Sequence, residues 1–253
     1  MFLISFHLFK IMPINLENLI FFAVFLPIVV AALLIVSKLK ERCPQKIWLR
    51  FLIIEIVLFL TRVFLLVFDL GSFPDLEMDP LFYALAFFMG LGFMYVYVTK
   101  IEGATLKSVG WFFKVNNVGK QLLYGFLGCI ALLIASVGLM AVLLDYQLST
   151  DLSIGADQFI TALFFGLGAI YEEWFFRGLI YQKTDLTSIQ KISISSLMFL
   201  GIHVGYLSFT GYGVYYITMA IMALMLGYLA YKLGIISSAT AHGFYVFIGA
   251  LTA

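Results

Sequence analysis

Three charged residues stand close together in an otherwise uncharged, apolar stretch of this 253-residue chain. Residues 171–177 read Tyr-Glu-Glu-Trp-Phe-Phe-Arg, and Glu172, Glu173 and Arg177 are the only charged residues within 159–182. A charged side chain at bilayer depth costs roughly 2.5–3.5 kcal/mol on insertion scales, so such residues tend to face a protein interior or a water-filled cavity and to function there. A structural ion pair that holds helices together is the alternative interpretation.

Two of the three histidines, His203 and His242, lie in apolar segments that follow this stretch. With a rise of 1.5 Å per helical residue, we expect Glu172 about 15 Å, His203 about 18 Å and His242 about 12 Å from the same membrane face. The carboxylate and both imidazoles are therefore predicted to share one layer of the membrane, although they belong to three separate helices. A lone buried histidine is usually an ordinary core residue, but this combination requires a joint explanation.

The chemistry that these residue types suggest is hydrolysis. Glu173 and Arg177 are four residues apart on a helix and are expected to pair, which leaves Glu172 freer. A carboxylate held in a low-dielectric pocket can take a proton from water and return it to a leaving amine, while a histidine opposite holds the water or stabilises the oxyanion. Alternatively, Glu172, His203 and His242 ligate Zn²⁺ and leave one position open for water. The residues alone leave both mechanisms open.

The composition of the chain indicates which class of protein contains these residues. Hydrophobic residues make up 63% of the chain and charged residues 11%, and the mean hydropathy is +1.07, which excludes a soluble domain of this size. The apolar runs are continuous rather than alternating, which excludes a membrane barrel. We therefore predict an all-α, polytopic membrane bundle of about eight transmembrane helices. The predicted spans are 16–37, 47–68, 80–99, 118–144, 157–182, 191–209, 212–231 and 234–252.

The charges between the spans predict how the bundle is oriented. Basic residues occur in every odd-numbered connection, whereas the even-numbered connections are acidic or uncharged. By the positive-inside rule the odd connections are cytoplasmic, so both termini are predicted to be non-cytoplasmic in a multi-pass protein of the cell membrane. A net charge of +1 gives no reason to expect a nucleic-acid partner, so membrane lipids are the predicted surroundings. The basic residues of the odd connections are Lys38, Lys40, Arg42, Lys46, Lys100, Lys107, Lys114, Lys183, Lys191 and Lys232.

The motifs in the second half of the chain resemble those of the CAAX-protease and bacteriocin-processing family, also called the Abi family, of polytopic intramembrane peptidases. The family pattern is Glu-Glu-x-x-x-Arg on one span, Phe-x-x-x-His on the next, and His-x-x-x-Asn near the end. The first two motifs match fully, and the third has valine in place of asparagine. The corresponding segments are Glu172-Glu173-Trp-Phe-Phe-Arg177, Phe199-Leu-Gly-Ile-His203 and His242-Gly-Phe-Tyr-Val246.

This resemblance implies an endopeptidase that acts on membrane-associated or lipidated peptides and proteins. Glu172 resembles the family residue that activates water, and His203 resembles its partner. Glu173 and Arg177 would be supporting residues, and His242 would be either a metal ligand or an oxyanion stabiliser. The resemblance does not decide between a glutamate-type and a metal-dependent peptidase. It also divides the chain into N-terminal spans, 1–150, and a family-like catalytic core of four helices, 151–253.

Val246 stands where the third motif has asparagine, and this difference favours other interpretations of the function. If the asparagine donates to the oxyanion, its loss could reduce the rate roughly 10²–10³-fold, unless a hydroxyl of Tyr171, Thr240 or Tyr245 replaces it. A relative that has lost catalysis and acts as a membrane scaffold or regulator is therefore the main alternative. A transporter that uses the buried acid and histidines as a proton relay is a third interpretation, although the chain shows no pair of matching halves.

Overall fold

The structure is a computed structural model that describes residues 16–43, 46–67, 80–109, 117–144, 155–183, 185–203 and 213–252. This part of the chain is almost entirely helical and contains no strand, which confirms the predicted all-α class. The elements are α1 (Leu16–Arg42), α2 (Ile47–Val67), α3 (Pro80–Val96), the π-helix η1 (Tyr97–Ile101), the 3-10 helix η2 (Leu106–Val109), α4 (Val118–Leu144), α5 (Ala156–Glu173), the π-helix η3 (Trp174–Gly178), α6 (Leu179–Lys183), α7 (Ser188–His203), α8 (Gly213–Leu233) and α9 (Ile235–Thr252).

The helices correspond to the predicted spans. Helix α3 continues directly into η1, and α5, η3 and α6 form one unbroken helical segment, so the described residues contain eight helical segments besides the short 3-10 helix η2. The sixth predicted span, 191–209, corresponds to α7, which begins at Ser188; its last residues lie outside the described part. Three described segments are long and apolar enough to cross a membrane by themselves, namely Val118–Leu139, Ala156–Tyr181 and Tyr216–Leu233, and shorter apolar helices cover Phe87–Ile101 and Ile235–Leu251.

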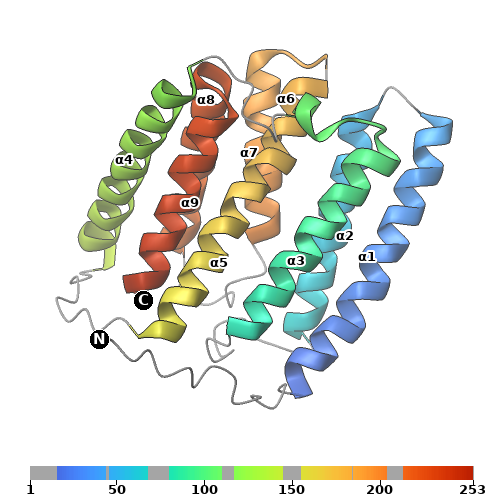
Figure 1. The fold of residues 1–253 in the computed structure, drawn as a ribbon, viewed down its shortest axis with the longest axis horizontal. Helices are drawn as coiled ribbons and strands as arrows, with labels where there is room; N and C mark the ends of the chain where they lie inside the picture. Colours follow the sequence, from blue (N-terminus) through green and yellow to red (C-terminus); the bar gives the residue numbers. More distant parts are fainter. Residues whose placement is uncertain are drawn as a thin grey trace, which may run out of the picture.

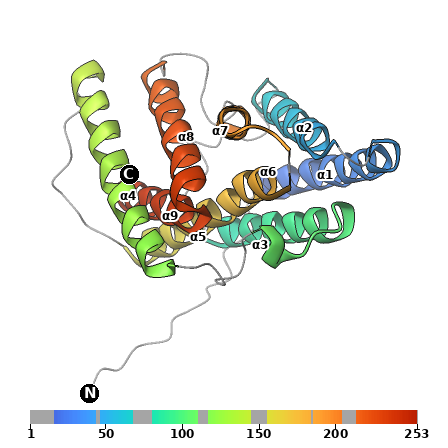
Figure 2. The ribbon, with the colours of Figure 1, turned by 90° about the horizontal axis from the view of Figure 1, so that it is seen from above.

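The helices run side by side in two layers. Figure 1 shows α9 between α4 and α5, with α3 beyond α5 and α1 at the far edge. Viewed from above, α4, α9, α5 and α3 form one row, and α8, α7 and α2 form the second (Figure 2). The start of α1 and the end of α9 lie at the same end of the bundle, while the α1–α2 and α8–α9 junctions lie at the other (Figure 1). This arrangement agrees with an even number of spans.

Two apolar cores hold the layers together. The larger core contains aromatic rings from α2, η1 and η3, and its Phe51 and Phe175 rings lie 4.7 Å apart. The smaller core lies between α4, α7, α8 and α9 and includes the fully buried Phe199. Because the larger core joins α2 to η3, it contains residues from both predicted segments, 1–150 and 151–253. That division of the chain stays a prediction.

Close contact between α5 and α9 depends on two glycines. A methyl group added to Gly166 would lie 3.0 Å from the carbonyl oxygen of Gly243, and one added to Gly243 would lie 3.1 Å from the carbonyl oxygen of Gly166. Both positions are therefore too close to the opposite backbone for a side chain. This short separation allows polar side chains on α5 and α9 to meet directly further along the pair.

Candidate functional site

A fully buried carboxylate forms the centre of the site. Glu173, the last residue of α5, is 0% exposed, and its Oε1 accepts hydrogen bonds from Arg177 and, at 3.0 Å, from Nδ1 of His242 on α9. Its Oε2 accepts a hydrogen bond from Ser238, also on α9. Arg177 and His242 are buried as well, so this cluster is a desolvated ion pair with two further donors. The predicted pairing of Glu173 with Arg177 is confirmed.

Arg177 connects this carboxylate to the second layer of helices. Its Nη2 donates to the carbonyl oxygen of Ala223 on α8 at 3.1 Å, and the same oxygen accepts a hydrogen bond from Ser196 on α7 at 2.9 Å. Its guanidinium also lies over the ring of Phe199, 5.2 Å from the ring centre. Arg177 and its partners therefore fix four helical segments relative to one another, because every buried polar atom that they use requires its partner.

The segment that carries Arg177 is a π-helix. It begins directly after Glu173 and ends at Gly178, whose Cα lies so close to the carbonyl oxygen of Val109 in η2 that a side chain would collide with it. Single π-turns within longer helices are uncommon and occur frequently at functional sites. Here the π-turn follows the glutamate pair immediately, so it determines how the chain continues from the two carboxylates to Arg177.

The two predicted site histidines both lie close to the ring of Phe199. The ring centres of Phe199 and His203 are 4.3 Å apart, and those of Phe199 and His242 are 5.1 Å apart. Nδ1 of His203 donates to the carbonyl oxygen of Phe199 at 2.6 Å, so Nε2 is the acceptor nitrogen of the neutral ring. Nδ1 of His242 is held by Glu173, which makes Nε2 its acceptor in the same way.

Glu172 differs from its neighbour in exposure. Adjacent residues on a helix point about 100° apart, and the structure accordingly leaves Glu172 partly exposed whereas Glu173 is completely buried. His203, at the end of α7, is also partly exposed. The predicted site residues thus divide into a buried group, Glu173, Arg177 and His242, which meets at the Glu173 carboxylate, and two more accessible residues, Glu172 and His203.

The predicted zinc ligands are not gathered into a metal site. Among the described residues, which include the side chains of Glu172, His203 and His242, no group of three His, Cys, Asp or Glu side chains is placed to hold a metal ion. Glu173 and His242 do meet, but Arg177 lies on the same carboxylate oxygen, and its positive charge disfavours a divalent cation there. The residues present therefore do not fit the alternative zinc site.

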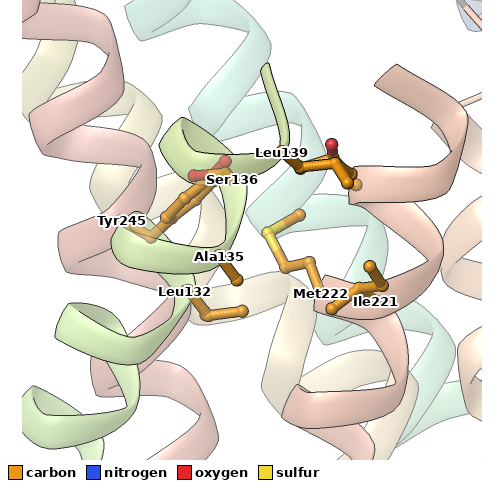
Figure 3. A pocket seen from close by; sticks show the side chains of 8 residues that line it. Leu132, Ala135, Ser136, Leu139, Ile221, Met222 and Tyr245 are labelled. Atoms are coloured by element: carbon orange, nitrogen blue, oxygen red, sulfur yellow. The ribbon is translucent and has the colours of Figure 1, made fainter. Parts of the chain in front are cut away.

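The three hydroxyl groups that could replace the motif asparagine lie against other helices. Tyr245 and Ser136 of α4 line the same small cavity between α4, α8 and α9 (Figure 3). The Tyr171 hydroxyl lies against Gly90 of α3, and the Thr240 side chain lies against Gly125 of α4. These contacts give no support to a replacement donor. Val246, one helical turn after His242 on α9, is partly buried.

Sequence analysis did not identify two serines of the cluster. Ser238 precedes His242 by four residues on α9, and Ser196 lies three residues before Phe199 on α7. The spacing of Ser238 from His242, which places both on one face of a helix, is the signal that could have indicated it. Serine is so common in membrane helices that this spacing alone does not single it out.

Fold and site together define a polytopic helical membrane protein with a buried Glu–Arg–His cluster beside an accessible glutamate and histidine. Residues 155–248 match a family model described as Rce1-like, type II CAAX prenyl endopeptidase. The matched segment contains Glu172, Glu173, Arg177, His203 and His242, and it confirms the family resemblance predicted from the motifs. Comparison with curated proteins gave no match, and neither did comparison with solved structures.

Proposed function

We propose that this protein is an intramembrane endopeptidase that hydrolyses membrane-associated or lipidated peptides and proteins with a water activated by Glu172. The observation that carries the proposal is the difference between two adjacent glutamates inside the segment that matches the family. Glu173 is buried and bonded to three donors, whereas Glu172 is partly exposed. A carboxylate already occupied by three donors is a poor base, so the accessible neighbour is the better candidate.

The proposed mechanism assigns one role to each residue. Glu172 removes a proton from water as the oxygen attacks the scissile carbonyl carbon, and it later gives that proton to the leaving amine. His203 accepts a hydrogen bond from the attacking water through Nε2, since its Nδ1–H is bonded to the carbonyl oxygen of Phe199. His242, when protonated, donates from Nε2 to the oxyanion. Glu173 and Arg177 hold His242 in place.

The mechanism that we propose is of the glutamate type rather than the metal-dependent type. It requires only groups that this chain supplies, and the described residues offer no three-ligand cluster for zinc. We also propose that the basic connections are cytoplasmic, that both termini are outside the cytoplasm of a cell membrane, and that the site opens toward the cytoplasmic half of the bilayer. Membrane lipids and a peptide segment of the substrate are then its partners.

The test is cleavage of a panel of membrane peptides, with and without a lipid anchor, by the purified full-length protein. Glu172→Gln should reduce the rate by about 10²–10⁴-fold, the usual contribution of a positioned general base. Asp157→Asn is the matched control, because it removes an exposed carboxylate from the first turn of the same helix. Cleavage by Glu172→Gln at the wild-type rate would contradict the assignment of the base.

A non-catalytic scaffold or regulator is the second candidate, and Val246 is the observation that favours it. Valine cannot donate a hydrogen bond, so the third motif lacks the donor that its asparagine would supply. The two candidates differ in a cell-based assay, because a scaffold should tolerate Glu172→Gln and a peptidase should not. Absence of cleavage by folded wild-type protein across the peptide panel would favour the scaffold.

A further inference from the structure

Ser238 occupies a position in the buried cluster that no motif assigns. Its side chain is 0% exposed, and its hydroxyl donates to Oε2 of Glu173. It lies four residues before His242, so one face of α9 supplies two donors to the same carboxylate. Arg177, from the helical segment of Glu173 itself, supplies the third donor. The three donors come from two helical segments and are arranged unequally around the two carboxylate oxygens.

The unequal distribution of donors between the two oxygens of Glu173 gives Ser238 a role that Arg177 and His242 do not share. Both Arg177 and His242 donate to Oε1, whereas Ser238 donates to Oε2. The last torsion of a glutamate side chain is broad and roughly two-fold, so donors on one oxygen do not fix the plane of the carboxylate. A donor on the second oxygen does fix it. Ser238 therefore holds Oε1 in line with Nδ1 of His242.

The orientation of His242 depends on this carboxylate. A histidine whose Nδ1–H is held by a carboxylate has a defined tautomer and a defined ring direction, so its Nε2 points to one place. We infer that Ser238 is a positioning residue for the proposed peptidase, one that orients His242 through the Glu173 carboxylate. The inference rests on the proposed function, and it extends the site by one residue beyond the three sequence motifs.

The neighbouring serine provides a matched control. Ser237 is also 0% exposed and lies in the same turn of α9, but its Oγ has no hydrogen-bond partner among the described residues. Ser237→Ala and Ser238→Ala therefore make the same chemical change at the same depth, and only Ser238→Ala removes a donor from Glu173. Any difference between the two variants reports the hydrogen bond rather than the loss of a buried oxygen.

The first measurement is steady-state cleavage by the full-length protein in detergent or nanodiscs. Ser238→Ala should lower kcat about tenfold with little change in KM, since one hydrogen bond to a charged group is lost and substrate binding is untouched. Ser237→Ala should retain the wild-type kcat. Ser238→Thr, which keeps the hydroxyl, should recover most of the activity, and that recovery separates positioning from a general loss of structure.

The second measurement does not depend on cleavage. The chain has three histidines, so ¹⁵N-histidine labelling gives few resonances, and His242→Gln assigns the signal of interest. The Nδ1–H resonance of His242 should shift in Ser238→Ala and stay in place in Ser237→Ala. Ser238→Cys, with nearly the same volume and a weak donor, should shift it less, and this variant keeps the test available where Ser238→Ala does not fold.

A lower kcat and a displaced resonance in Ser238→Ala, with neither in Ser237→Ala, would support the inference. Equal behaviour of the two alanine variants in both measurements would overturn it, as would a Ser238→Cys protein indistinguishable from wild type in both. Absence of cleavage by wild type would instead overturn the proposed function, and with it the contribution of Ser238 to a peptidase. The resonance comparison would still decide whether Ser238 orients His242.

Discussion

Two buried arginine–glutamate pairs lie in the described part of this bundle, and they are built differently. Arg50 of α2 and Glu102, just after η1, have side chains that are 1% and 2% exposed, and Arg177 and Glu173 are both 0% exposed. Each pair also adjoins a π-helix, η1 in one case and η3 in the other. Burial and local backbone therefore do not distinguish the pairs. The remaining partners of each carboxylate and each guanidinium do.

All three nitrogens of the Arg50 guanidinium are hydrogen bonded, two to the Glu102 carboxylate and one to a backbone carbonyl oxygen. Nε of Arg50 donates to Oε1 of Glu102 at 2.8 Å, Nη2 donates to Oε2 at 2.5 Å, and Nη1 donates to the carbonyl oxygen of Cys43 at 2.7 Å. Nearby, Lys40 donates to the carbonyl oxygen of Ile101. These contacts join the end of α1 and the start of α2 to the end of η1. The Arg50 pair thus has the geometry of a structural ion pair, which holds the α1–α2 junction against the residues that follow η1.

The Glu173 pair shares its carboxylate with groups that can do chemistry. One oxygen of Glu173 accepts from Arg177 and from an imidazole, and the second accepts from Ser238. Nε of Arg177 has no hydrogen-bond partner among the described residues, so this guanidinium is less completely bonded than that of Arg50. Burial of an ion pair therefore does not by itself indicate function. The other groups bonded to the pair do, here His242 and Ser238 on Glu173 and a backbone carbonyl on Arg50.

The largest effect that we expect concerns stability and is shared by both pairs. Glu173→Ala and Glu102→Ala each leave a buried arginine without its charge partner, which should lower the free energy of unfolding by about 3–5 kcal/mol. Thermal unfolding of the purified variants in detergent measures this loss. An unchanged melting temperature in either variant would show that its arginine finds another partner, and would remove that pair from the comparison.

Replacement of each arginine by lysine should distinguish the pairs by their bonding. Lysine keeps the charge but lacks the planar fork, so each charge-assisted bond that it cannot form should cost about 1.5–3 kcal/mol. Arg50 forms three such contacts and Arg177 two with Glu173 and Ala223. We therefore expect Arg50→Lys to destabilise the protein more than Arg177→Lys in denaturant titration. The reverse order would contradict the assignment of Arg50 as the more completely bonded residue.

Restoring the motif asparagine should change the activity of the site that contains Glu173 and leave the Arg50 pair unaffected. Val246→Asn places a donor one turn after His242, and we expect it to raise the cleavage rate about tenfold, which is less than the roughly 10²–10³-fold attributed to a preorganised oxyanion donor. Initial rates on the best peptide of the panel measure this gain. Ile248→Asn, further along the same helix, is the control for adding an amide to α9. No gain, or an equal gain in the control, would count against an oxyanion role at position 246.

A chelator should have the smallest effect. The proposed mechanism needs no metal, so incubation with a strong chelator, followed by zinc, should change the cleavage rate less than about twofold. The measurement is the rate before chelation, after chelation and after zinc is restored. Loss of activity that zinc restores would favour the metal-dependent mechanism and would require the three predicted ligands to move together.

Sequence analysis predicted the helices well because continuous apolar runs and basic connections depend on the bilayer rather than on packing detail. It also placed Glu172, His203 and His242 in one layer, since depth follows from helical rise. Depth does not determine the direction in which a side chain points. The contact between Glu173 and His242 requires the Gly166–Gly243 approach of α5 and α9, and the contact with Ser238 requires the rotation of both helices, neither of which a single sequence specifies.

The most direct test of the difference between the two pairs is the cleavage rate, per folded molecule, of Glu173→Gln and Glu102→Gln measured side by side. Both changes neutralise a buried carboxylate while keeping its shape. We expect Glu173→Gln to lower the rate at least about tenfold, because His242 loses its charged acceptor, and Glu102→Gln to change it less than about twofold. Equal losses in the two variants, or full activity in Glu173→Gln, would show that the two carboxylates do not differ in function.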